Sequence, residues 1–453
     1  MIDRRMEMGR IFGTDGVRGV ANGDLTIQLA TDIGRAAGMV VEETAGPRPT
    51  FIVGKDTRVS SDMLEAALAA GLCSVGADVV LLGVVPTPAV AYLVTRYGAD
   101  AGIMLSASHN PYEYNGIKIF SGQGYKLLDV QEDEIERIVL DHERPYAVKA
   151  PSEIGTIRRS DTAVDDYVSY IKTTIDGDLS GMRVAIDCAN GSASVTAKKL
   201  FEGLGADCDI FHASPNGKNI NDGCGSTHVG ELAKHVACGG YDAGLAFDGD
   251  ADRCLAVDEH GELVDGDRLI ALFAYHLKEQ GKLKNNTLVA TVMSNLGLFK
   301  FAEQHDIDTR ATRVGDRYVL EAMLADDFCI GGEQSGHIIF RDYMTTGDGQ
   351  LSGVQLLSLL KTFQKPLSEA AGLMRTYPQT LLNVHATPQM KAALESDEQV
   401  RAVIDRLNGT LGGEGRILVR ASGTEPLIRI MVEGRDLAEI EAIAKEIAAV
   451  IEG

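Results

Sequence analysis

The sequence has no tryptophan, and none of its cysteines form a CxxC pair or show another spacing typical of a zinc site. An odd, dispersed set of cysteines favours reduced thiols in a cytoplasmic protein over a disulfide framework. Apolar runs of about 18 residues are missing too, and the start of the chain has no apolar signal core. We therefore expect no transmembrane helix, no membrane partner and a cytoplasmic location. The seven cysteines are Cys73, Cys188, Cys208, Cys224, Cys238, Cys254 and Cys329.

Positive charge is also scarce. The 43 Lys and Arg residues face 65 Asp and Glu residues, which gives a formal net charge of −22. Such a surface repels nucleic acid and anionic membranes, so we expect neither as a partner. It would also repel a phosphorylated small molecule, and any phosphate site must therefore gather arginine and lysine locally.

The length of 453 residues indicates three or four domains of roughly 100–150 residues each. A strand, turn, helix, turn, strand pattern recurs within 51–82, 183–211 and 287–312, which is typical of βαβ units. It predicts helices at 61–75, 194–204 and 298–305, and one of its strands at 183–187. We predict three related α/β domains with mixed sheets, followed by a C-terminal α+β domain, around a central cleft. The expected domains are 1–155, 156–257, 258–372 and 373–453.

A polar loop, Ser106–Pro111, follows the apolar segment 101–105. Ser108 stands beside His109 in this loop, and Lys118 follows closely. A serine in such surroundings can be an activated nucleophile or a phosphate carrier. It can equally be the N-cap of a helix, so this loop alone leaves the two interpretations open.

Three carboxylates, Asp248, Asp250 and Asp252, alternate with small residues after the apolar segment 243–247. Such a triplet can converge on one hard divalent cation. An EF-hand loop is the alternative, because Glu259 falls at its twelfth position. Its sixth position is Arg253 where the sharp turn needs glycine, and the flanks resemble strands, so a calcium-sensor module is disfavoured.

Two further loops carry groups suited to a sugar phosphate. In Gly331–His337 (Gly-Gly-Glu-Gln-Ser-Gly-His), the glycines let the backbone come close to a ligand. The Glu, Gln and Ser side chains offer hydrogen-bond donors and acceptors for sugar hydroxyls. Arg420–Pro426, with Arg429 nearby, is predicted to bind an anion. It supplies the local positive charge that a phosphate site needs in an acidic chain. Arg18 and Arg58 each lie in a predicted turn. They could line a phosphate site or form structural ion pairs.

These loops, in this order, resemble the α-D-phosphohexomutase superfamily over essentially the whole chain. Within it, six segments are similar to the members that act on glucosamine phosphates. These segments are Phe12–Gly19, Asp187–Gly191, Asn219–His228, Val314–Glu321, Gly331–His337 and Thr345–Gln350.

The resemblance implies that Ser108 is a phosphoserine, assisted by His109, Lys118 and Arg253. It also implies one Mg²⁺ per chain, held by Ser108 through its phosphate and by Asp248, Asp250 and Asp252. The residues that it assigns to substrate binding are Arg18, Glu333, Ser335, His337, Arg420, Ser422, Gly423, Thr424 and Arg429.

The reaction implied is an isomerisation of glucosamine 6-phosphate to glucosamine 1-phosphate, on the way to UDP-N-acetylglucosamine. Glucosamine 1,6-bisphosphate would be both intermediate and activator, in a monomer or homodimer. Two alternatives stay open at this point. One is a member of the superfamily that acts on mannose or glucose phosphates, and the other is a non-catalytic protein that binds sugar phosphates.

Overall fold

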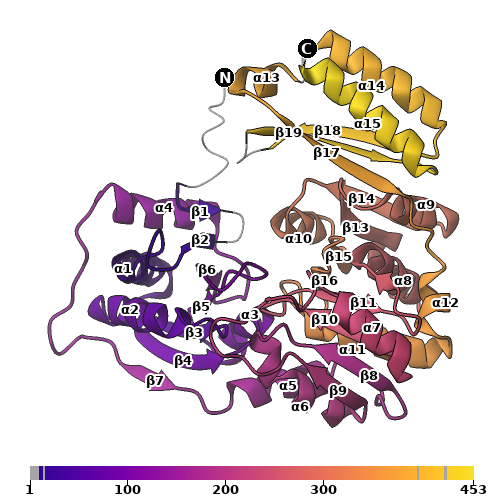
Figure 1. The fold of residues 1–453 in the computed structure, drawn as a ribbon. Helices are drawn as coiled ribbons and strands as arrows, with labels where there is room; N and C mark the ends of the chain where they lie inside the picture. The colour runs from indigo at the N-terminus through magenta and orange to yellow at the C-terminus, as the bar shows by residue number, and fades with distance from the viewer. Residues whose placement is uncertain (1–9, 14–15, 395–396, 423–425, 453) are drawn as a thin grey trace. The chain divides into compact units, whose positions relative to one another are not determined.

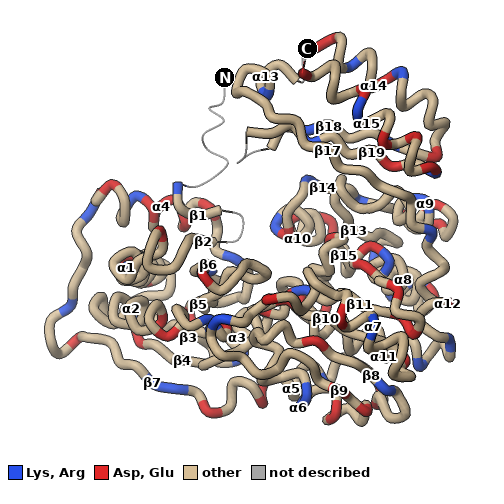
Figure 2. The backbone as a smooth tube through the Cα atoms, in the orientation of Figure 1, with Lys and Arg blue, Asp and Glu red and all other residues tan. Residues whose placement is uncertain are grey.

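The structure is a computed structural model that describes residues 10–13, 16–394, 397–422 and 426–452 (Figure 1). The chain divides into two compact units, Met1–Val292 with Thr309–Ala371 and Met293–Asp308 with Gly372–Gly453. Acidic and basic residues are scattered along both units (Figure 2). Among the described residues, no helix has the length and apolar character needed to cross a membrane.

The first unit opens with a seven-stranded mixed sheet. Three pairs of its strands are parallel (β3–β4, β3–β5, β4–β7) and three are antiparallel (β1–β2, β2–β6, β5–β6). In spatial order the strands are β1 (Phe12–Gly13), β2 (Gly16–Val20), β6 (Tyr114–Ser121), β5 (Ala101–Leu105), β3 (Thr50–Lys55), β4 (Asp78–Val84) and β7 (Ile157–Arg159). Its helices are α1 (Ile27–Ala45), α2 (Ser61–Ser74), α3 (Thr87–Arg96) and α4 (Asp129–Leu140).

Side-chain alternation along the strands divides these helices between the two faces of the sheet. Phe51 and Val53 of β3 belong to one core with the apolar faces of α1, α2 and α4. Gly54 points the other way, where an added Cβ would meet Val90 of α3 at 2.6 Å. Both faces are therefore covered, as the near-continuous apolar strands require.

Two smaller sheets complete the first unit. The second sheet has the order β12 (Leu263–Val264), β11 (Cys254–Val257), β10 (Ala243–Phe247), β8 (Arg183–Asp187) and β9 (Asp207–Phe211), with helices α5 (Ala163–Lys172), α6 (Ala197–Phe201) and α7 (Gly230–Gly239). The third sheet has the order β14 (Asp308–Thr312), β13 (Thr287–Thr291), β15 (Ile330–Gly332) and β16 (Ile338–Phe340), with helices α8 (Gly266–Glu279), α10 (Asp316–Ala325), α11 (Gly349–Phe363) and α12 (Leu367–Ala371).

The second unit contains a three-stranded antiparallel sheet in the order β17 (Gln379–His385), β19 (Leu427–Glu433) and β18 (Arg416–Ala421). Its helices are α9 (Leu296–Gln304), α13 (Pro388–Ala393), α14 (Glu398–Leu411) and α15 (Leu437–Glu452). Ile428, Ile430 and Val432 of β19 form its core with the apolar faces of α14 and α15. Glu433 accepts hydrogen bonds from the Leu296 N–H at the start of α9.

The predicted fold class, three α/β domains and a C-terminal α+β domain, is confirmed. The four domain boundaries remain predictions. The helix expected over 194–204 is broken into the 3₁₀ turns Ser192–Val195 and Glu202–Leu204 around α6. The Thr196 hydroxyl donates to Ala193 O at 3.4 Å, and such side-chain bonds to the backbone compete with a regular α-helix.

Glu132 of α4 is buried beside Lys126, whose Nζ lies 3.3 Å from Glu132 Oε2. Burial raises the pKa of this carboxyl from 4.5 to about 7, although Lys126 opposes the shift. The folded state therefore holds an extra proton between these values, and the free energy of unfolding falls as pH rises through that window.

Glu132→Gln should remove this pH dependence. Each pKa unit is worth about 1.4 kcal/mol, so the variant should gain up to roughly 3 kcal/mol over the parent between pH 4 and pH 8. Urea unfolding at both pH values measures the difference. The neighbouring, more exposed Glu134→Gln is the control, and an equal gain in both variants would contradict the prediction.

Candidate active site

Ser108 lies in the loop that follows β5, at the carboxyl end of a strand parallel to β3. Its backbone is left-handed, with φ 51°, and its side chain is 2% exposed. The Ser108 N–H donates to Ser106 Oγ at 2.9 Å, which fixes the turn. Ser108 Oγ donates to Asp248 Oδ2 at 2.6 Å, so the serine loop meets the aspartate loop.

Asp248, Asp250 and Asp252 follow β10, and one oxygen of each lies within 4.8 Å of the others. All three are buried, and Asp250 Oδ1 and Asp252 Oδ1 have no hydrogen-bond partner in the described part of the chain. Burial, followed by the neighbouring carboxylates, raises the pKa of both Asp248 and Asp250. A hard divalent cation fits this set of oxygens, because it would satisfy the unpaired atoms and neutralise the crowded charge.

Neighbouring segments hold the aspartate loop in shape. Thr87, at the start of α3, donates through Oγ1 to Asp250 Oδ2 at 2.6 Å, and its N–H donates to Asp250 O at 2.9 Å. Ala251 has a φ of 56°, and its carbonyl accepts from the Gly349 N–H at 3.0 Å. An added Cβ at Gly349 would lie 2.2 Å from Arg253 O, so only glycine permits this approach.

Cationic side chains surround the carboxylates. Arg253 Nε lies 3.8 Å from Asp252 Oδ1 and 4.0 Å from Asp248 Oδ2. Arg253 Nη1 lies 3.2 Å from His109 Nδ1. Lys118 of β6 places Nζ 3.8 Å from Asp252 Oδ2. Predicted catalytic residues from separate segments therefore gather at one place.

Arg18 lies on β2 opposite Gly116 of β6. An added Cβ on Gly116 would lie 2.4 Å from Ser106 O and 3.2 Å from Arg18 Cγ. The positive charge of Arg18 also acts on Asp250. Arg18 therefore lies close to the serine loop and the aspartate loop.

The loop between β15 and β16 carries Glu333, Ser335 and His337. The Gly347 N–H lies 3.1 Å from His337 Nε2, and His337 Nδ1 lies 3.5 Å from Asp252 Oδ2. Burial raises the pKa of Glu333, whose Oε1 accepts from the Gly315 N–H at 3.1 Å. Ser335 Oγ is buried and has no hydrogen-bond partner among the described residues.

A cavity of about 420 Å³ adjoins these residues. Its walls include Lys118, His337 and Asp316, together with apolar side chains from β6, β16 and α10. Its size falls within the roughly 300–1,000 Å³ of small-molecule sites. The first unit therefore brings together a serine, three carboxylates that could hold a metal ion, cations and a cavity large enough for a sugar.

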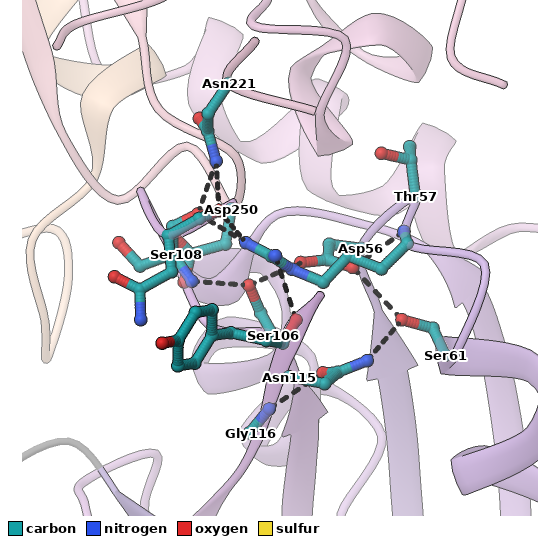
Figure 3. A network of polar contacts seen from close by, with 12 residues as sticks. Asp56, Thr57, Ser61, Ser106, Ser108, Asn115, Gly116, Asn221 and Asp250 are labelled. Atoms are coloured by element: carbon teal, nitrogen blue, oxygen red, sulfur yellow. Dashed lines mark hydrogen bonds and ion pairs between the residues drawn. The ribbon is translucent and has the colours of Figure 1, made fainter. Parts of the chain in front are cut away.

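Two residues that sequence reasoning did not assign to the site clamp the serine loop (Figure 3). The Arg58 guanidinium donates to the carbonyl oxygens of Ser108 and Asn110 at 2.9 and 2.8 Å. Asn221 Nδ2 donates to the same two oxygens at 2.9 and 3.1 Å. Asp56 accepts from Arg58 Nε at 2.7 Å and fixes the guanidinium. Arg58 could have been suspected from its turn. Asn221 lies in the segment Asn219–His228 that carries the family resemblance, but it is 113 residues from Ser108, so the sequence gave it no role.

Asn221→Gly should lower kcat by roughly 10- to 100-fold with little change in KM, because it loosens the serine loop without removing a reacting group. Glycine tolerates the φ of 58° at this position, so only the carboxamide is lost. Steady-state kinetics measures the effect. Asn285→Gly, the same change at another left-handed asparagine, is the control and should leave kcat unchanged.

The second unit holds the predicted phosphate cradle. Arg420 of β18 lies opposite Arg429 of β19, and burial together with Arg429 lowers the pKa of Arg420. Ser422 is buried, and its N–H donates to Leu427 O at 2.8 Å. Two guanidiniums directly opposite each other repel, and an anion between them would remove that cost. Gly423 and Thr424 lie outside the described residues.

Sequence profiles of one family match all four parts of the chain. Phosphoglucomutase/phosphomannomutase alpha/beta/alpha domains I, II and III match residues 9–145, 165–261 and 265–377, and the C-terminal domain of that family matches 381–450. The chain belongs to the phosphoglucomutase/phosphomannomutase family. It is an enzyme that moves phosphate within a sugar phosphate, that is, a mutase of the isomerase class.

Among the similar proteins are enzymes that act on glucosamine phosphates. Phosphoglucosamine mutase from Acetivibrio thermocellus is 53% identical over 98% of this chain and 99% of its own length. Phosphoglucosamine mutase from Clostridium novyi is 52% identical with the same coverage. Among solved structures, a phosphoglucomutase/phosphomannomutase family protein from Burkholderia thailandensis has a TM-score of 0.83 at 24% identity, covering 98% of this chain and 97% of that one. Aspergillus fumigatus N-acetylphosphoglucosamine mutase in complex with GlcNAc-6P and magnesium has a TM-score of 0.67 at 18% identity, covering 94% and 96%.

Proposed function

We propose that the chain interconverts glucosamine 6-phosphate and glucosamine 1-phosphate, with Ser108 as the phosphate carrier. The observation that carries this assignment is the 2.6 Å contact of Ser108 Oγ with Asp248, inside a buried carboxylate triad. Full-length identity of 53% to a phosphoglucosamine mutase supports the choice of sugar. The seven cysteines are free thiols, which fits a reducing cytoplasm.

The first step transfers the phosphoryl group of Ser108 to the O1 hydroxyl of glucosamine 6-phosphate. The bond from phosphorus to Ser108 Oγ breaks as the bond from phosphorus to O1 forms, and the proton of the O1 hydroxyl is passed on to Ser108 Oγ, which is left as a hydroxyl. Lys118 lies beside the triad, where it can relay this proton. The product is glucosamine 1,6-bisphosphate. After it turns around in the site, the bond from phosphorus to O6 breaks, the phosphoryl group returns to Ser108 Oγ, and the proton of the Ser108 hydroxyl passes to O6. Glucosamine 1-phosphate then leaves. Added bisphosphate loads Ser108 by the same reaction and so acts as the activator.

The protein contributes mainly position and charge to this chemistry. Asp248, Asp250 and Asp252 would hold one Mg²⁺ per chain, which when bound supplies positive charge next to the transferring phosphoryl group. Arg253 and His109 lie where they can contact the phosphoryl oxygens. Arg18 borders the same place, and we assign it to the substrate.

The sugar and its second phosphate require separate groups. We assign the hydroxyls to Glu333, Ser335 and His337, because these side chains share one loop beside the triad. We assign the non-reacting phosphate to Arg420, Ser422, Gly423, Thr424 and Arg429, since this loop concentrates arginine in an otherwise acidic chain.

Asp316 offers a reason for amino-sugar preference. Its carboxylate lines the cavity with Lys118 and His337, and its Oδ2 lies 3.9 Å from His337 Nε2. The protonated 2-amino group of glucosamine is a cation, and a nearby carboxylate would favour it over a hydroxyl. Asp316→Asn should therefore reduce the preference for glucosamine over glucose phosphate by roughly tenfold, which is about 1.4 kcal/mol.

Substrate competition tests the function directly. We expect kcat/KM for glucosamine 6-phosphate to exceed the values for glucose 6-phosphate and mannose 6-phosphate. Higher values for glucose or mannose would place the chain with the other mutases of the family. Binding of all three sugars without turnover, even with added bisphosphate and Mg²⁺, would instead favour a non-catalytic binding protein.

A further inference from the structure

A second group of metal-ligating side chains lies apart from the aspartate triad. Asp187 ends β8, His212 follows β9, and Cys224 lies in the segment before α7. One ligand atom of each lies within 4.8 Å of the others. Asp187 and Cys224 are fully buried, whereas the His212 side chain is 26% exposed, which leaves a route from solvent.

His212 turns its Nδ1 into the cluster. Its Nε2 lies 3.7 Å from Glu231 Oε2, which can accept a ring proton on that side when Nδ1 binds a cation. Its Nδ1 is buried 3.0 Å from Asp187 Oδ2, yet it makes no hydrogen bond within the described part of the chain. A cation bound by both His212 Nδ1 and Asp187 Oδ2 would give this buried nitrogen a partner.

Backbone and amide groups orient the other two ligands. Asp187 accepts from the Ala189 N–H at 2.8 Å and from the Gly225 N–H at 2.9 Å. Asn190 Nδ2 lies 3.8 Å from Cys224 Sγ and can donate to a thiolate. Such outer hydrogen bonds hold the ligands of protein metal sites in place.

We propose that Asp187, His212 and Cys224 form a second cation site, for Zn²⁺, with water at the fourth position. Thiolate and imidazole ligands select zinc over magnesium, whereas the all-oxygen triad of Asp248, Asp250 and Asp252 selects a hard cation. Zinc binding forms the zinc–sulfur bond and releases the thiol proton to solvent.

The site lies next to the clamp on the serine loop. Ala189 O accepts from the Asn221 N–H at 2.9 Å, and Asn190 O accepts from Thr57 Oγ1 at 2.6 Å. Asn221 and the neighbour of Thr57, Arg58, hold the Ser108 carbonyl. Zinc at this site therefore has a structural role, fixing the segments from which Asn221 and Arg58 reach the phosphate carrier.

Metal binding to the full-length chain tests the proposal. The protein is stripped with a chelator, titrated with Zn²⁺ in excess Mg²⁺, and separately with Co²⁺, which reports thiolate ligation by a sulfur-to-cobalt charge-transfer absorption. We expect one Zn²⁺ per chain, the cobalt absorption, and release of one proton per metal at neutral pH. The triad contains no sulfur and cannot give this absorption.

Two variants and two controls locate the site. His212→Asn keeps a residue that tolerates the left-handed φ of 47°, and Cys224→Ser keeps the size of the side chain. Each should weaken zinc binding by at least about a hundredfold and abolish the cobalt absorption. Cys188→Ala and His235→Asn, which alter neighbouring residues outside the cluster, should retain both.

Unchanged zinc affinity in His212→Asn and Cys224→Ser would overturn the proposal, as would absence of the cobalt absorption and proton release in the parent protein. Asp187 and His212 would then form an ion pair only. The cobalt absorption and the proton release are measured on the unmodified protein. They can therefore contradict the proposal even if a variant does not fold. None of these measurements involves sugar turnover, and the result is therefore independent of the proposed function.

Discussion

Ser108→Gly is expected to lower kcat by at least about a thousandfold, the largest effect of any single substitution in the chain. The variant removes the only atom that we assign to carrying the phosphoryl group, Ser108 Oγ. Glycine is preferable to alanine because residue 108 has a φ of 51°, which glycine adopts without strain. Steady-state turnover of glucosamine 6-phosphate with added bisphosphate measures the loss.

Ser106→Ala is the matched control for this prediction. Ser106 Oγ accepts from the Ser108 N–H and donates to Asp56, so its loss should disturb the loop without removing the carrier. We expect a reduction of roughly tenfold in kcat and retained phosphorylation of Ser108. Equal activity of Ser108→Gly and Ser106→Ala would refute the role of Ser108.

Removal of the divalent cation is expected to have the second largest effect. Dialysis against a chelator should lower kcat by about a hundredfold or more, and added Mg²⁺ should restore it. Asp250→Asn should show a similar loss that Mg²⁺ does not restore, because one of the three carboxylates is gone. The thermal midpoint of the stripped parent should rise on adding Mg²⁺, since the cation relieves three crowded, buried carboxylates.

Asp258→Asn serves as the control for that experiment. Asp258 is also buried and follows β11 of the same sheet. Its carboxylate accepts hydrogen bonds from the His260 and Glu262 N–H groups of a turn. Its replacement should leave the response to Mg²⁺ unchanged. Full activity of the stripped parent, or an Mg²⁺ response in Asp250→Asn equal to that of the parent, would contradict the metal assignment.

Local patterns predicted most of the secondary structure. The strand expected at 183–187 is β8 within the same bounds, and the helix expected at 61–75 is α2. These elements have strong period-2 or period-3.6 patterns and clear turn residues at their ends. The helix expected at 298–305 is also present as α9, but it belongs to the second unit. Sequence pattern gave no sign of this, because the partner, Glu433 on β19, is more than 100 residues away.

In the candidate site, too, local motifs could be predicted from the sequence, whereas contacts between distant segments could not. Ser108, the three aspartates and His337 could be chosen from the sequence because reactive groups stand in compact loops after apolar strands. Thr87 and His212 could not, and Asn221, Asp187 and Cys224 lie in segments that carry the family resemblance, but the sequence gave none of them a role. Their partners come from distant segments, and single polar residues in loops look alike until the fold brings them together.

Phosphoryl loading of Ser108 tests the central claim most directly. The full-length protein, first freed of phosphate by incubation with substrate lacking bisphosphate, is mixed with glucosamine 1,6-bisphosphate and Mg²⁺, and its intact mass and phosphopeptides are measured. We predict a gain of one phosphoryl group, located on Ser108, with release of glucosamine monophosphate, and no gain in Ser108→Gly. Turnover without any adduct on Ser108, or an adduct on another residue that persists in Ser108→Gly, would contradict the account.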